Sequence, residues 1–146
     1  MARRWGLSIG SFVLALLFGV TSLAGGNVGS AVALFLFFAV VAAIVSPRAF
    51  PKSVTDAEAR ARSAEDGRPI VYWRPGCPFC MRLRASLGRR ANRLHWVDIW
   101  ADPAGAASVR AVADGNETVP TVITSDAAMV NPRPEVVRAL ISAHSA

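Results

Sequence analysis

Two cysteines separated by two residues are the most reactive feature of this 146-residue sequence. Cys77 and Cys80 lie in the run WRPGCPFC, and the chain has no other cysteine. A pair at this spacing can contribute to a metal site, close a small structural disulfide, or act as a redox couple. The partners available elsewhere in the chain decide among these three chemistries.

A metal site and a structural disulfide are both disfavoured. Structural zinc needs four ligands, but the sequence has one cysteine pair, and His95 and His144 lack a matching spacing. We therefore expect no metal. A Cys77–Cys80 disulfide would close so short a loop that its entropic stabilisation would be small, and the cytoplasmic location predicted below would keep it reduced.

A redox couple requires its first cysteine at the start of a helix, where the dipole and free N–H groups favour the thiolate. Residues 69–73 predict a buried strand, and residues 78–90 predict a helix that begins with proline, a favoured first helical residue. Arg74 adds a nearby positive charge. We predict that Cys77 is the nucleophile and that Cys80 attacks the mixed disulfide formed on it.

Strands and helices alternate through the rest of the C-terminal part. Strands are expected at 94–100, 119–124 and 127–130, and helices at 103–113 and 132–142, the two helices being capped by Asp102 and Asn131. This order predicts an α/β domain with a four-stranded mixed sheet, in which the first pairing is parallel and the last two strands form a hairpin. The expected core comprises Ile70, Tyr72, Leu83, Leu87, Val97, Ile99, Val109, Val112, Val122, Val137 and Leu140.

A second motif, TVPTV, begins at Thr118. A strand, then CPFC on a helix, then TVPTV resembles the glutaredoxin family of the thioredoxin fold. The resemblance implies that Pro120 is cis and faces Cys77, that Thr118 and Val119 line the substrate groove, and that Arg74 binds a substrate carboxylate. It implies a thiol–disulfide oxidoreductase that reduces protein disulfides or thiolated proteins.

Within that family, the run VDIWADPAGAASVRAVADGNETVPTV and the later Asn131-Pro132 resemble the actinobacterial mycoredoxins. Glutathione-dependent members carry Gly-Gly and an aspartate after the third strand. This sequence has TSDAAMVNPRPEVV there, with Asp126 as a loose substitute. The resemblance therefore favours mycothiol over glutathione as co-substrate, with no bound cofactor.

Three alternatives stay open. The chain could be a thioredoxin-like electron donor reduced by a flavin reductase, or a non-catalytic redox-sensing or interaction module. Ligation of an iron–sulfur cluster across a dimer, known among glutaredoxins, is disfavoured by Pro78. The sequence does not indicate the protein substrate or the oligomeric state.

The N-terminal part is a different kind of sequence, without a charged residue between positions 6 and 46. The run AGGNVGS predicts a turn at 24–30. We therefore expect two transmembrane helices, at about 7–23 and 28–45, that form a hairpin within residues 1–46. A linker with a short helix is expected at 47–67, and the glutaredoxin-like domain at 68–146.

Basic residues flank the hairpin, with Arg3 and Arg4 before it and Arg48 and Lys52 after it. The positive-inside rule then predicts a multi-pass inner-membrane protein whose termini and redox domain are cytoplasmic. Phe50 is expected to lie at the membrane interface. The net charge of +6 comes without a nucleic-acid-binding motif, so we expect no nucleic-acid partner.

Overall fold

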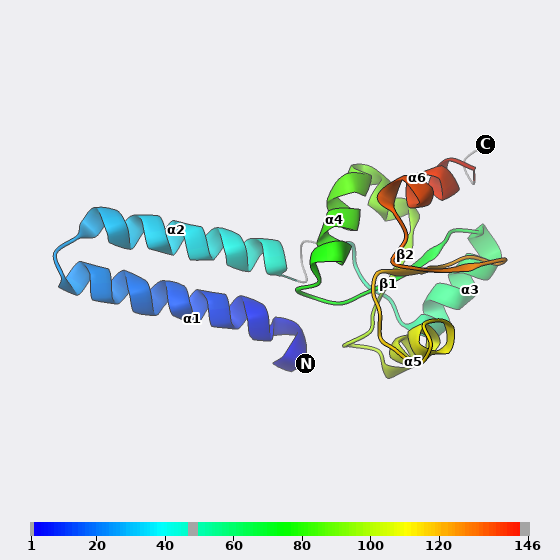
Figure 1. Ribbon diagram of the computed structural model, residues 1–146, viewed down its shortest axis with the longest axis horizontal. Helices are drawn as coiled ribbons and strands as arrows, with labels where there is room; N and C mark the ends of the chain where they lie inside the picture. Colours follow the sequence, from blue (N-terminus) through cyan, green and yellow to red (C-terminus); the bar gives the residue numbers. More distant parts are fainter. Residues whose placement is uncertain (1, 47–49, 144–146) are drawn as a thin grey trace. The chain divides into compact units, whose positions relative to one another are not determined.

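A computed structural model describes residues 2–46 and 50–143 of the chain. Contacts divide the chain into two compact units, residues 1–49 and residues 50–146. The first unit is helical and the second contains the sheet (Figure 1). The predicted flanking residue Arg48, and His144 at the other end, lie outside the described residues.

The first unit consists of two helices that pack against each other, α1 (Ala2–Ala24) and α2 (Val28–Val45). The break between them is where the sequence predicts it. Gly26 has a φ of 74°, which glycine adopts readily, and the Asn27 side chain caps α2 by accepting a hydrogen bond from the Ser30 N–H at 3.3 Å. α1 begins five residues before the expected span and includes Arg3 and Arg4.

The two predicted membrane spans are not supported. Among the described residues, no helix has both the length and the apolar character needed to cross a membrane. Membrane contact through residues 7–45 and the cytoplasmic location of the redox domain stay predictions from the sequence.

The second unit is built on a four-stranded mixed sheet in the order β2-β1-β3-β4. Its strands are β1 (Ile70–Trp73), β2 (His95–Asp98), β3 (Thr121–Ile123) and β4 (Ala128–Val130). β1 runs parallel to β2 and antiparallel to β3, and β3 and β4 form the predicted hairpin. Every residue of β1 and β2 is buried, because helices cover both faces of the sheet.

Helices α3 (Asp56–Asp66) and α5 (Pro103–Val112) cover one face of the sheet. The other face carries α4 (Pro78–Leu87), a 3-10 helix named η2 (Gly88–Arg93), and α6 (Pro134–Ala143). Figure 1 shows α4 and α6 on one side of the strands and α3 and α5 on the other. The sheet therefore separates two helical layers.

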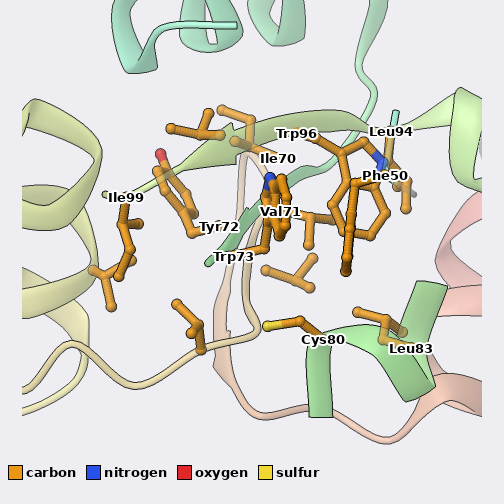
Figure 2. Close-up of a cluster of buried hydrophobic side chains, with 14 of the residues drawn as sticks. Phe50, Ile70, Val71, Tyr72, Trp73, Cys80, Leu83, Leu94, Trp96 and Ile99 are labelled. Atoms are coloured by element: carbon orange, nitrogen blue, oxygen red, sulfur yellow. The ribbon is translucent and has the colours of Figure 1, made fainter. Parts of the chain in front are cut away.

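The aromatic centre of the core includes a residue that was expected at a membrane interface. Phe50 is buried and stacks on Trp73 with a ring-centroid distance of 3.8 Å, and it meets the Trp96 ring edge-on at 5.7 Å (Figure 2). Ala59 of α3 is also fully buried. Residues 50–67, expected to be a linker, thus belong to the same compact unit as the sheet.

A polar network attaches α3 to its neighbours. The Tyr72 hydroxyl donates to one carboxylate oxygen of Asp56 at 2.6 Å, and Arg60 Nε donates to the other at 2.9 Å. Arg60 also donates to Ser108 Oγ of α5 at 2.9 Å. Burial opposes ionisation of Asp56, but these hydrogen bonds outweigh it and lower the Asp56 pKa below its usual value. The sequence does not predict this network, because Asp56, Tyr72 and Ser108 lie far apart in the chain.

Several predicted boundaries were wrong. The helix expected to reach Arg90 ends at Leu87, because Gly88 adopts φ 52° and the chain tightens into η2. The strand expected at 94–100 is shorter, and residues 100 and 101 form a turn. Asn131 adopts φ 49° and precedes α6 without capping it. Of the expected core residues, Val112 is 38% exposed and Leu140 is only partly buried.

Candidate active site

Cys77 lies where strand β1 gives way to helix α4. It is the N-cap residue of α4, and Pro78 occupies the first helical position. The Cys77 Sγ accepts a hydrogen bond from the Cys80 N–H at 3.3 Å. A free backbone donor of the helix N-terminus is thus satisfied by sulfur, as the sequence predicts for a reactive thiolate.

The pKa of Cys77 is lowered to about 6. The largest cause is hydrogen bonding from the Cys80 thiol, followed among the favourable contributions by the N–H groups of Cys80 and Phe79 and by the charge of Arg74. Burial acts in the opposite direction but is outweighed. Cys77 is therefore mostly thiolate at neutral pH, although the residue is only 5% exposed.

Cys80 has the opposite character. Its side chain is fully buried among the apolar residues beneath the sheet (Figure 2). Its hydrogen bond to Cys77, its burial and the negative charge of the Cys77 thiolate all raise the Cys80 pKa. The environment thus favours the thiolate form of Cys77 and the protonated form of Cys80. Both are free thiols.

The TVP segment lies against Cys77. The Cys77 Sγ is 3.4 Å from the Val119 carbonyl oxygen, to which the protonated thiol donates. The Val119–Pro120 peptide bond is cis, as the resemblance implies. The following backbone is in the sheet, where the Pro120 carbonyl accepts the Asn131 N–H at 2.8 Å.

The other two predicted substrate-binding residues lie differently. The Arg74 guanidinium carbon lies 5.8 Å from the centre of the Trp100 ring. The positive charge of Arg74 helps to lower the Cys77 pKa. Thr118 is exposed, and its carbonyl accepts a hydrogen bond from the Thr121 hydroxyl at 2.7 Å. Neither residue has a described side-chain contact with Cys77. Their roles toward substrate stay predictions.

The comparisons with known proteins agree with this geometry. Residues 70–127 match the glutaredoxin family. Two proteins named as glutaredoxins, from Mycobacterium tuberculosis strains CDC 1551 / Oshkosh and H37Rv, are each 39% identical to this chain over 72 residues. The match covers 47% of this chain and 83% of each relative.

The chain belongs to the glutaredoxin family. The matched region contains both cysteines, the cis proline and strands β1 to β3. It leaves out α1, α2 and α3, so the family relationship concerns the sheet-containing unit. The α/β fold and four-stranded mixed sheet predicted from the sequence are confirmed.

A polar pocket beside this glutaredoxin site was missed by the sequence reasoning. It has a volume of about 280 Å³ and lies between α4 and the start of α6, where its lining includes Phe79, Arg82, Asn131, Arg133 and Glu135. Phe79, between the cysteines, is 56% exposed and forms part of the pocket wall. The sequence lacks Gly-Gly near Asn131, but only the fold brings this region beside α4.

The role of Asp126 as a loose substitute for the aspartate of glutathione-dependent members stays a prediction. Asp126 lies in the turn between β3 and β4, where its N–H donates to the Thr124 hydroxyl at 3.4 Å. The acidic residue in the first turn of α6 is Glu135. Among the side chains that the structure describes, no three His, Cys, Asp or Glu residues gather as a metal site requires.

Proposed function

We propose that this glutaredoxin-family chain is a thiol–disulfide oxidoreductase with Cys77 as its nucleophile and mycothiol as its co-substrate. The observation that carries the proposal is the Cys77 sulfur at the N-cap of α4, with a pKa of about 6, beside the cis Val119–Pro120 bond. A thiolate that forms near neutral pH combines availability with nucleophilicity.

The first step is an exchange of sulfur partners. The Cys77 thiolate attacks the mycothiol sulfur of a protein–mycothiol mixed disulfide. A bond forms between Cys77 and mycothiol, the old S–S bond breaks, and the protein leaves as a thiolate that takes a proton from water. The Cys80 thiol and the N–H groups that stabilised the Cys77 thiolate are then released from that role.

The second step removes mycothiol from Cys77 by one of two routes, of which only the first regenerates the Cys77 thiolate directly; the second leaves a disulfide that two further mycothiol molecules have to reduce. A second mycothiol thiolate attacks the bound mycothiol, giving the mycothiol disulfide and the free Cys77 thiolate. Alternatively, Cys80 loses its proton and attacks Cys77 Sγ, giving a Cys77–Cys80 disulfide and free mycothiol. The hydrogen bond between the Cys80 thiol and Cys77 supports the second route, while the buried and protonated state of Cys80 makes it the slower one.

The choice of mycothiol rests on the segment between β4 and α6. It has Asn131, Pro132 and Arg133 where glutathione-dependent members carry Gly-Gly, and it faces the polar pocket. A flavin reductase could still reduce the same cysteines directly. Turnover with reductase alone, without a low-molecular-weight thiol, would support that alternative.

The test compares Cys77→Ser and Cys80→Ser with the unmodified chain on a protein–mycothiol mixed disulfide. We expect Cys77→Ser to reduce it no faster than free mycothiol does, and Cys80→Ser to retain the route through a second mycothiol. Release of mycothiol is followed by mass spectrometry, with glutathione in a parallel series. Full activity of Cys77→Ser would refute Cys77 as nucleophile, and faster turnover with glutathione would refute the preference for mycothiol.

A further inference from the structure

The exposed surface that surrounds the end of α4 is strongly cationic. Residues 78–93, which form α4 and η2, include five arginines and no acidic residue. We call the arginine face the exposed Arg82, Arg89 and Arg90 of this segment together with the exposed Arg133, which precedes α6. Arg84 is excluded because it donates to the Gly88 carbonyl at 3.0 Å.

The acidic side chain among the described residues that line the neighbouring pocket already has a partner. Glu135 accepts a hydrogen bond from Arg138 at 2.9 Å, and Arg82 adds a further attraction that contributes to a lowered Glu135 pKa. Arg82 and Arg133 line the same pocket as Phe79. The positive charge therefore reaches from η2 to the residue between the two cysteines.

The arginines on the opposite face of the sheet are arranged differently. Arg60, Arg62 and Arg68 each form an ion pair, with Asp56, Glu58 and Asp66 respectively. Positive charge on that face is neutralised within the domain. The charge on the arginine face is not matched in this way, which suits it to a negatively charged partner.

We infer that the arginine face binds an acidic segment of the substrate protein, next to the thiolated cysteine that leaves when Cys77 attacks its mixed disulfide. This inference rests on the proposed function. A substrate cysteine that reaches Cys77 must bring its flanking residues against the surface of α4 and the neighbouring pocket. Charge complementarity at that position raises the rate of encounter.

The length of α4 sets where the acidic residues should be. A helix of ten residues is about 15 Å long, and an extended peptide advances about 3.3 Å per residue. Acidic residues about four or five positions from the substrate cysteine would therefore reach Arg89 and Arg90 while the cysteine lies at Cys77. Nucleic acid suits the face less well, because Phe79 is the one large aromatic side chain that lines this pocket.

The test uses the pre-reduced full chain in single turnover, so that no recycling system is needed. The substrates are three peptides, each with one cysteine in a mixed disulfide with 2-mercaptoethanol. They carry Asp and Glu, Gln and Asn, or Lys, four and five positions from the cysteine. At low salt we expect the acidic peptide to react about three- to tenfold faster than the neutral one, and the difference to vanish at about 0.5 M salt because the charges are screened.

Matched variants locate the effect. Arg89→Gln/Arg90→Gln should reduce the rate advantage of the acidic peptide by at least half. Arg62→Gln/Arg68→Gln also removes two positive charges, but from the opposite face, and should preserve that advantage. Arg89→Glu/Arg90→Glu should shift the preference to the lysine peptide. An unchanged rate with the neutral peptide shows that each variant is folded and active.

Other outcomes overturn the inference. Equal rates for acidic and neutral peptides, or equal losses in the glutamine variants of the two faces, would show that the arginine face does not select acidic segments. Weaker binding of Arg89→Gln/Arg90→Gln to phosphatidylglycerol vesicles or to single-stranded RNA, with unchanged peptide selectivity, would assign the face to lipid or RNA instead. Failure of the neutral peptide to react at Cys77 would refute the proposed function itself.

Discussion

The two faces of the sheet differ in the kind of polar group that they hold. On the face covered by α3 and α5, the Asp56 carboxylate is held by Tyr72 and Arg60. On the face covered by α4, the Cys77 sulfur accepts hydrogen bonds from Cys80 and from the Phe79 N–H, which lower its pKa. Satisfied buried groups contribute to stability, whereas a stabilised thiolate contributes reactivity. We therefore expect changes on the first face to alter the free energy of unfolding and changes on the second to alter rates.

The largest effect should separate Cys77 from Cys80. With iodoacetamide at pH 7, the folded protein should be alkylated at Cys77 at least about a hundredfold faster than at Cys80, because one thiol is ionised and reachable and the other is protonated and buried. The Cys77 rate should rise through a midpoint near pH 6 and level off above it. Mass spectrometry of digested protein gives both rates.

In guanidinium both cysteines should titrate near the ordinary value of about 8.5. An alkylation midpoint above pH 8 for Cys77 in the folded protein, or equal alkylation rates for the two thiols, would show that the α4 face does not hold a reactive thiolate.

A smaller effect is expected from packing on the α5 face. A Cβ added at Gly105 would lie 2.6 Å from Val97 Cγ1, so Gly105→Ala forces either the Val97 side chain or α5 to move. After the better helix propensity of alanine is counted, we expect a loss of about 1–2 kcal/mol in the free energy of unfolding. Ala107→Ser, at an exposed position on α5, should change it by less than about 0.5 kcal/mol.

Chemical denaturation measures both Gly105→Ala and Ala107→Ser, and Cys77 alkylation should stay at the unmodified rate in each. Tenfold slower alkylation of Cys77 in Gly105→Ala would show that the two faces of the sheet are not independent.

Tyr72→Phe should cost about 1 kcal/mol, because it removes the hydroxyl that donates to the Asp56 carboxylate. The Asp56 pKa is lowered on folding, so its stabilising effect is present above the unfolded pKa of about 3.9 and is lost as the pH falls through the folded pKa. The difference between Tyr72→Phe and the unmodified protein should therefore be larger at pH 7 than at pH 3. A difference that does not depend on pH would mean that the bond to ionised Asp56 contributes little.

The smallest effect is expected from Arg74→Gln. The Arg74 charge contributes less to the Cys77 pKa than the hydrogen bonds from Cys80 and Phe79 do. The variant should therefore move the alkylation midpoint upward only slightly, and Arg74→Lys should restore it. If Arg74→Gln raised the Cys77 alkylation midpoint to that of an ordinary thiol, the Arg74 charge and not the helix N-terminus would be the main cause of the lowered Cys77 pKa.

The sequence alone determined the order of elements and the position of the reactive pair. Strand, cysteine, proline and helix follow from local preferences, so Cys77 at the N-cap and Pro78 at the first helical position could be predicted. The turn at Gly26, the Thr55 cap of α3, which accepts the Glu58 N–H at 3.2 Å, and the Gly67 C-cap are equally local. Each depends on residues within one turn of the chain.

Tertiary structure decided what local preference does not encode. Phe50 is followed by proline after a long apolar segment, and only the buried faces of Trp73 and Trp96 explain why it belongs to the core. The pocket joins Phe79 to residues about fifty positions later in the chain, and the Asp56 network joins α3 to Tyr72 and Ser108. Such contacts depend on how separate elements pack, because the free energy that stabilises them is gained only when distant surfaces are buried together.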